Sequence, residues 1–521
     1  MPTRTLYAIS DIHLGGAPGF QLCPPAVRRR LARFLHHLCD RAEAGETLEL
    51  IVNGDFIDFL AEEPVNEDGG AFPGSAHPGG FEAFTSDPAH ARAKLRRAIL
   101  RTDEDALEGH QVFPAFRRFT QAGNRLTVLL GNHDLELCLP GVREALVDAL
   151  TGDAPARLRF IDDGQAYRVG RCVFDHGNRA DGWNQVLHDL LRRTRSALSR
   201  GETYAFEPPP GSALVVEVMN PLKQQYRFID LLKPEEEAVI PVLVALDPYR
   251  MDKATSALGR VREYASLARR LVELRVIAER RSDSLDPLAV SGWMDTPAVG
   301  LDALQASGTL EEPEEQPSID ALLIEIAALS HPEGAEQPDI LGDGLSGMRV
   351  SGALQQSARV GLARASQRHR GLRRALLALR ETYGRTFDVG IEEPHYLEAA
   401  ASLAGEDGRL VVFGHTHLAK QIPLAGGGLY LNTGTWCPVI RLPERLYQPS
   451  TSPGDEAQVL NALFNFIHDL EENRLEPWTQ QHSTFSRVVV DPESGEWQDA
   501  QLLAWRDDDT WAPFEGYPEP L

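Results

Sequence analysis

Short apolar runs alternate with amphipathic stretches over residues 1–182 of this chain, and short apolar runs return near its end. The runs predict strands at Thr5–Ser10, Leu48–Asn53, Leu126–Leu130, Gln165–Val169, Cys172–Asp175, Leu410–Phe413 and Leu429–Asn432, and a hairpin of Arg487–Asp491 with Gln501–Trp505. A helix is predicted between the first two runs, starting near Pro25, because apolar residues recur at helical spacing from there to Leu38. Such alternation is typical of an α/β layer fold.

Polar motifs directly follow five of these runs: Ser10-Asp11-Ile12-His13, Gly54-Asp55-Phe56-Ile57-Asp58, Gly131-Asn132-His133-Asp134, Asp175-His176-Gly177 and Gly414-His415-Thr416-His417. Ligands of open α/β sheets bind at the carboxyl ends of the strands, so we expect these motifs to converge at one edge. Residues two apart on an extended segment share a face, which applies to both Asp11-x-His13 and His415-x-His417.

The residue types in these motifs predict a metal site. Seven candidate ligands combine imidazole, carboxylate and amide groups: Asp11, His13, Asp55, Asn132, His176, His415 and His417. Nitrogen and oxygen donors without a thiolate suit Mn, Fe or Zn, and we expect Mn²⁺ first. Seven ligands are too many for one ion but suit two ions that share a carboxylate. Two-metal sites activate a bridging hydroxide and clamp the oxygens of a phosphoryl group during displacement.

Together the motifs resemble those of the calcineurin-like metallophosphoesterase superfamily, D-x-H, G-D-x-x-D, G-N-H-D/E, H and G-H-x-H. The resemblance covers about residues 1–180 and 405–440. It implies a four-layer α/β fold, in which two packed mixed β-sheets are flanked by helices. It also implies hydrolysis of a phosphodiester or pyrophosphate bond by a metal-bridging hydroxide, in a nucleotide-linked or lipid-linked substrate.

The same resemblance implies a role for each residue. One metal ion would be held by Asp11, His13, Asp55 and His417. The other would be held by Asp55, Asn132, His176 and His415, so that Asp55 bridges the two ions. His133 would stabilise the transition state and protonate the leaving oxygen, and Asp58 would orient and polarise His133.

Within the superfamily, three stretches resemble in sequence the UDP-2,3-diacylglucosamine hydrolase-like branch, which cleaves a pyrophosphate in lipid A assembly: Asn53–Phe59, Gly131–Leu137 and Leu431–Trp436. Phosphoprotein phosphatases carry Arg-Gly directly after the second aspartate of the motif. Here Phe59-Leu60 follow Asp58, which disfavours that class of enzyme. Two features depart from the branch: His133 stands where well-known members carry Arg, and the segment between His176 and His415 is far longer than usual. We therefore expect this long insertion to select the substrate.

The chain is predicted to consist of a first core part at 1–182, a mainly helical insertion at 183–404, and a second core part with a C-terminal tail at 405–521. An acidic linker is expected near 301–348, a stretch without Lys or Arg. The helical insertion is also the candidate for contact with a lipid or membrane surface. The sequence leaves the oligomeric state open.

Composition narrows the choice of partner and compartment. A net charge of −24 disfavours nucleic acid as the partner, although Arg-rich stretches in the insertion keep a DNA nuclease of the same superfamily as an alternative. A binding scaffold on a disabled phosphoesterase fold is a second alternative. It predicts that some metal ligands are missing, whereas all seven candidate ligands are present in the sequence. Five cysteines without Cys-x-x-Cys spacing, and no apolar run near the roughly 18 residues of a membrane helix, predict a cytoplasmic protein.

Arg179 lies three residues after His176 and is a candidate for holding the substrate phosphate. A surface salt bridge is the alternative role for this side chain.

Overall fold

The computed structural model describes residues 4–63, 81–107, 109–224, 226–233, 242, 369–370, 372–374, 376–377 and 380–520. The acidic linker predicted near 301–348 lies outside the described residues. The described part is an α/β structure with three mixed sheets and several helices.

The largest sheet has seven strands in the order β15-β14-β13-β1-β2-β3-β4. Its parallel half is β1 (Arg4–Ile9), β2 (Thr47–Asn53), β3 (Arg125–Leu129) and β4 (Leu158–Ile161). Its antiparallel half is β13 (Ser483–Val490), β14 (Trp497–Trp505) and β15 (Trp511–Pro513). Strand β1 joins the halves, because it pairs in parallel with β2 and antiparallel with β13.

A second sheet has five strands: β5 (Tyr167–Val169), β6 (Cys172–Phe174), β8 (Leu410–Phe413), β10 (Leu429–Thr433) and β9 (Ala419–Pro423). Side chains of both sheets share one apolar cluster, which places the sheets face to face. Leu6 and Ala8 of β1 point into this cluster, whereas Tyr7 and Ile9 point to the other face, as strand alternation requires.

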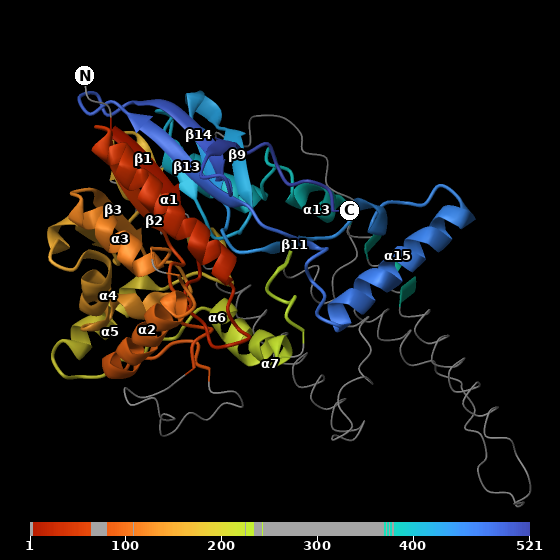
Figure 1. Cartoon of the computed structure of the whole chain (residues 1–521), viewed down its shortest axis with the longest axis horizontal. Helices are drawn as coiled ribbons and strands as arrows, with labels where there is room; N and C mark the ends of the chain where they lie inside the picture. Colours follow the sequence, from red (N-terminus) through yellow and green to blue (C-terminus); the bar gives the residue numbers. More distant parts are fainter. Residues whose placement is uncertain are drawn as a thin grey trace, which may run out of the picture.

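Helices cover the outer faces of both sheets. The seven-stranded sheet packs against α1 (Pro25–Glu43), α2 (Pro88–Asp103), α3 (Val112–Gln121) and α4 (Val142–Thr151). The five-stranded sheet packs against α14 (Pro394–Ala404). Figure 1 shows α1 to α4 gathered on one side of the molecule, beside α5 (His188–Leu198).

A separate apolar cluster joins the described part of the predicted insertion to the C-terminal part. It contains a three-stranded sheet of β7 (Leu232–Lys233), β11 (Val439–Arg441) and β12 (Thr479–Gln480). Helix α15 (Pro453–Glu471) packs there and lies far from α1 to α5 (Figure 1). Its first turn is capped by Ser452, whose hydroxyl accepts a hydrogen bond from the Asp455 amide.

The remaining described helices are short: α6 (Pro210–Leu214), a π-helical turn (Val215–Met219), α7 (Asn220–Lys223) and α13 (Arg380–Thr386). Turns of 3₁₀ helix occupy Leu135–Cys138, Pro155–Arg157, Asn178–Ala180, Ala425–Gly427 and Glu444–Leu446. Among the described residues, no helix combines the length and the apolar character needed to cross a membrane.

The strands expected from the apolar runs are all present within a few residues of their expected bounds. The hairpin forms with Arg487 opposite Gln501. The predicted C-terminal tail takes part in the fold: Trp511–Pro513 extend the large sheet as β15, and the Ala419 amide donates a hydrogen bond to the Tyr517 hydroxyl. The predicted insertion is helical in much of its described part but also supplies β7 and the sheet-covering helix α14.

Candidate metal centre

All five polar motifs meet where strands of the two packed sheets end. The first three follow β1, β2 and β3 of the seven-stranded sheet, and the others follow β6 and β8 of the five-stranded sheet. Backbone hydrogen bonds tie the first two loops together, since the amides of Ile12 and His13 both donate to the Asp55 carbonyl. The His415 amide donates to the Asp11 carboxylate at 2.9 Å, which joins the C-terminal motif to the N-terminal one.

One group of candidate ligands is Asp11, His13 and His417. The Nε2 atoms of His13 and His417 lie 3.1 Å apart, although these residues are 404 positions apart in the chain. The Nε2 atom of His417 is 3.5 Å from Oδ1 of Asp11. Two imidazole nitrogens and a carboxylate oxygen therefore face a common point.

A second group is Asp11, Asp55 and His176. The His176 Nδ1–H donates to the Asn53 carbonyl at 2.9 Å, so that its Nε2 is the nitrogen left to bind a metal. This Nε2 lies 3.3 Å from Oδ2 of Asp55 and 3.3 Å from Oδ1 of Asn132.

Two further contacts concern the amide of Asn132 and the position of Asp55. The Asn132 side-chain nitrogen donates to Oδ1 of Asn184, which directs the Asn132 oxygen toward the site. Oδ2 of Asp55 lies between the groups, 3.3 Å from the His176 Nε2 and 3.9 Å from the His13 Nε2. Asp11 is the carboxylate that belongs to both groups, whereas Asp55 belongs to the second group alone, so its predicted role as the bridge between two ions stays a prediction.

His415 contacts the site through its backbone and its ring. Its ring centroid lies 5.3 Å from that of His176. Its Nε2 lies 3.0 Å from Oδ2 of Asp181. The pKa of this partly buried carboxyl lies below its usual range, because hydrogen bonds from His415, Asn184 and the Trp183 amide outweigh the effect of burial. The other ring nitrogen, Nδ1, is therefore the one that His415 would offer to a metal.

His133 and Asp58 form a pair at the edge of these groups. The His133 Nδ1 lies 3.3 Å from Oδ1 of Asp58, and the His133 ring meets the His13 ring edge-on at 4.7 Å. The His133 side chain is 15% exposed, whereas the His13 side chain is fully buried. These two histidines and Asp58 also make a third group of atoms close enough to hold an ion.

Arg179 does not join these groups among the described contacts. It packs beside Gly164 and His188, and the charges that act on it are those of Asp175 and Asp163. Burial lowers the pKa of Arg179, and the two carboxylates only partly offset this effect. Its predicted role with the substrate phosphate remains a prediction.

The chain matches no protein-family model, no curated protein and no solved structure. Its function is therefore inferred from the sequence motifs and from the geometry of the site.

Backbone strain marks the same site. Seven non-glycine residues of the described part have a positive φ, and five of them lie here: Asp11, His13, Asp55, His415 and His417. Their φ angles lie between 48° and 72°, in a region that costs free energy for residues with a Cβ. Strain of this kind persists where surrounding structure enforces it, and it clusters at functional sites.

Burial and charge oppose each other in this site. Burial raises the pKa of Asp11 to about 6 and lowers the pKa of His13 to about 4. Burial also disfavours the charged form of His176, but the carboxylates of Asp55 and Asp11 outweigh it and raise the pKa of His176 to about 10. The two buried carboxylates thus favour a positive charge between them, which is what a bound cation supplies.

Several supporting residues had no role in the sequence-based prediction. Asp134 accepts hydrogen bonds from the amides of Gly131 and Phe56, so it fixes the third motif to the second. Asp134 is the last residue of the motif Gly131-Asn132-His133-Asp134, so its position in the sequence already pointed to the site. Thr435, whose hydroxyl donates to the Asp11 carbonyl, lies in the stretch Leu431–Trp436 that carries the resemblance to the branch, but its contact with Asp11 joins segments 424 residues apart.

Gly131 leaves no room for a side chain beside Asp55. A Cβ at this position would lie 2.0 Å from Oδ1 and 2.4 Å from the backbone nitrogen of Asp55. We therefore expect Gly131→Ala to displace Asp55, to destabilise the protein by about 1–3 kcal/mol and to reduce its metal content. Urea unfolding and elemental analysis measure the two effects.

Gly384→Ala is the matched control, because nothing lies within 4 Å of a Cβ at that position. Equal metal content in the two variants would contradict the placement of Gly131 against a metal ligand.

Proposed function

We propose that this chain is a phosphoesterase that uses two divalent metal ions and has the calcineurin-like metallophosphoesterase fold. The observation that carries the proposal is the meeting of ligands from opposite ends of the sequence, with His13 Nε2 and His417 Nε2 3.1 Å apart. The packing of a seven-stranded sheet on a five-stranded sheet, with helices on both outer faces, supports the fold.

The donor set fits two ions. Asp11, His13, Asp55 and His417 would hold one, and Asp55, Asn132, His176 and His415 would hold the other. Imidazole, carboxylate and amide donors suit Mn²⁺ best, with Fe or Zn as alternatives. When bound, the ions supply Lewis acidity, which lowers the pKa of a water molecule and offsets negative charge on the phosphoryl oxygens.

His133 would donate a proton to the leaving oxygen, and Asp58 would position it. The contact between Asp58 Oδ1 and His133 Nδ1 places a proton on Nδ1 when the ring is charged, which leaves Nε2–H to face the substrate. The amide of Ala61 donates to the same Asp58 oxygen, so the carboxylate is held in place.

Two lysines from the described part of the insertion add positive charge beside the site. Lys223 acts on Asp58, and Lys233 acts on His417. The Lys223 ammonium is buried, pairs with Asp230 and donates to the Phe20 carbonyl at 2.9 Å. Asp230 offsets the charge of Lys223, so the choice of a pyrophosphate as the substrate is proposed on the resemblance of the motifs to the UDP-2,3-diacylglucosamine hydrolase-like branch.

Removal and return of metal tests the proposal. Metal-stripped full-length protein is expected to leave bis(p-nitrophenyl) phosphate intact, and Mn²⁺ is expected to restore hydrolysis by at least about 100-fold, the range of a lost electrostatic contact in catalysis. Release of p-nitrophenol and bound metal per chain are the two measurements.

The same protein can then be offered a UDP-linked glycolipid and DNA. Preference for the glycolipid supports the branch, whereas preference for DNA supports the nuclease alternative. A chain that binds no metal and hydrolyses none of these substrates would contradict the proposal and favour a binding scaffold.

A further inference from the structure

A short hydrogen-bond network links two of the residues assigned to the second ion, Asn132 and His415. The Asn132 Nδ2 donates to Oδ1 of Asn184 at 3.1 Å, and the Asn184 Nδ2 donates to Oδ2 of Asp181 at 2.7 Å. The same Asp181 oxygen lies 3.0 Å from Nε2 of His415. Asp181 and Asn184 lie in the loop after His176, so a single loop reaches residues of two other motifs.

The carboxylate of Asp181 fixes the direction of each hydrogen bond in this network. An ionised carboxylate accepts hydrogen bonds and donates none. Its second oxygen, Oδ1, accepts the Trp183 amide at 2.8 Å, so both oxygens already have donors. Asn184 therefore turns its NH₂ toward Asp181, and its own oxygen faces Asn132.

Both ligands take their orientation from this arrangement. Asn132 turns its NH₂ toward Asn184, so its oxygen, the atom that can bind a cation, points to the ion site. That oxygen lies 3.3 Å from Nε2 of His176, another residue assigned to the second ion. His415 carries a proton on Nε2, toward Asp181, which leaves the lone pair of Nδ1 for a metal.

Segments of the predicted insertion hold both ends of the network. The Gly211 amide of α6 donates to the Trp183 carbonyl at 2.7 Å, and a Cβ at Gly211 would lie 2.2 Å from Oδ1 of Asn184. At the other end, the buried Tyr396 of α14 has its ring 6.1 Å from that of His415. The loop and the histidine are therefore packed in place rather than open to solvent on these sides.

We propose that Asp181 is a positioning residue for the second ion. Its carboxylate fixes the ring proton of His415 directly. Through Asn184, it also fixes the amide orientation of Asn132. This inference rests on the proposed two-ion function and deepens it, because it names the residue that prepares two ligands of one ion. The ligands assigned only to the first ion take no part in the network.

Asp181→Asn is expected to reverse the network. The Trp183 amide requires an acceptor, so the oxygen of the new side chain takes the Oδ1 position, and the new NH₂ takes the Oδ2 position. A donor there favours the His415 tautomer with its proton on Nδ1. It also turns Asn184 over, and Asn132 with it, so that an N–H of each ligand points at the ion. Asp181→Ala removes the acceptor without adding a donor.

Titration calorimetry of the metal-stripped full-length chain with Mn²⁺ measures the effect. The unaltered chain is expected to bind two ions. Asp181→Asn is expected to weaken one ion about 100-fold and Asp181→Ala about 10-fold, with the affinity for the other ion unchanged. A residue that only fills space would show the opposite order, because Asn keeps the volume of Asp whereas Ala leaves a cavity.

Two further variants complete the test. Asn184→Ala separates Asn132 from Asp181 and is expected to weaken one ion about 10-fold, which tests the network even if Asp181→Asn does not fold. Asp189→Asn, at an exposed position on α5, is the matched control and is expected to bind both ions like the unaltered chain. Circular dichroism reports the fold of each variant.

Unchanged affinities in Asp181→Asn or in Asn184→Ala would overturn the inference, and so would a larger loss in Asp181→Ala than in Asp181→Asn. These results would leave the proposed function intact, since the unaltered chain would still bind two ions. An unaltered chain that binds no Mn²⁺ would overturn the inference together with the proposed function.

Discussion

Replacement of Asp55 by Asn is expected to lower the Mn²⁺-dependent kcat for bis(p-nitrophenyl) phosphate by about 10³-fold, which corresponds to about 4 kcal/mol. Oδ2 of Asp55 is the carboxylate oxygen that lies within 4 Å of both the His13 and His176 Nε2 atoms. An amide there removes a negative charge and turns an N–H toward a cation.

The fold is expected to survive this change. The other oxygen, Oδ1, accepts the His133 amide at 2.9 Å, and an Asn side chain can keep that hydrogen bond. The rate is measured at saturating Mn²⁺ together with bound metal per chain and the circular dichroism spectrum. Asp105→Asn, at an exposed loop position, is the control. A folded Asp55→Asn protein with more than about a tenth of the unaltered rate would exclude Asp55 as a bridging ligand.

Replacement of His133 by Gln is expected to lower kcat by about 10²–10³-fold while KM and metal content stay close to those of the unaltered chain. A residue that only transfers a proton to the leaving oxygen is used in the transition state, so its loss affects kcat rather than substrate binding. The geometry leaves a second role open, because His133, His13 and Asp58 also lie close enough together to hold an ion.

Two readouts separate these roles. A proton donor matters more for a basic leaving group, so the loss is expected to be larger for an alkyl phosphodiester than for bis(p-nitrophenyl) phosphate. A ligand role would instead lower metal content and affect both substrates alike. His395→Gln serves as the control, because this half-exposed histidine lies on α14 and belongs to none of the ligand groups.

The sequence predicted much of the core because the information there is local. Each apolar run that became a strand is continuous, and each polar motif follows its strand directly, as in β1 before Asp11 and β8 before His415. Strand ends in parallel order bring their loops together, so convergence of the motifs could be expected without knowing any contact.

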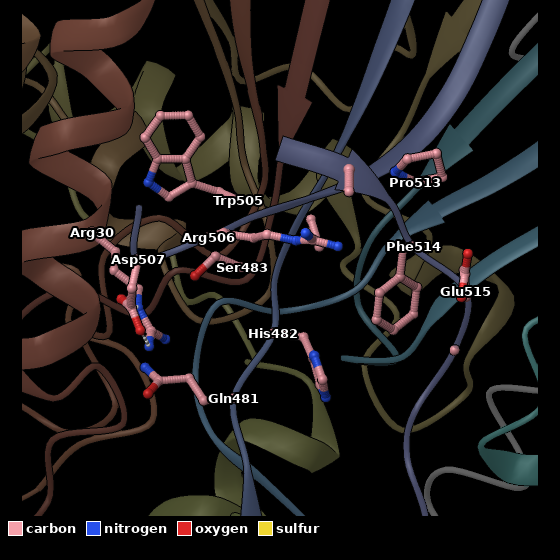
Figure 2. Close-up of a pocket in the computed structure, with 13 residues that line it drawn as sticks. Arg30, Gln481, His482, Ser483, Trp505, Arg506, Asp507, Pro513, Phe514 and Glu515 are labelled. Carbon is pink, nitrogen blue, oxygen red and sulfur yellow. Dashed lines mark hydrogen bonds and ion pairs between the residues drawn. The ribbon is translucent and has the colours of Figure 1, made fainter. Parts of the chain in front are cut away.

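Other features depend on partners far away in the chain. The support of His415 by Asp181 and the pairing of β7 with β11 join segments more than 200 residues apart, and neither segment carries a periodic pattern. Strand β15 was missed because Trp511–Pro513 is short and contains a proline, which an edge strand tolerates. A cavity beside Trp505 (Figure 2) is lined by four segments, one of them in α1 and the other three near the C-terminal end of the described chain, so it had no signal in the sequence.

The position of β1 between β2 and β13 has a consequence for synthesis on the ribosome. Arg4 pairs with Val490, so one edge of β1 has no partner until nearly the whole chain has been made. At about 5–20 residues per second, that edge stays open for roughly 25–100 s. An open edge of buried apolar residues can pair with another nascent chain. Assembly of the core, and with it the capture of metal between His13 and His417, is therefore a late event, and a chain stopped early would expose its central strand rather than fold into half a protein.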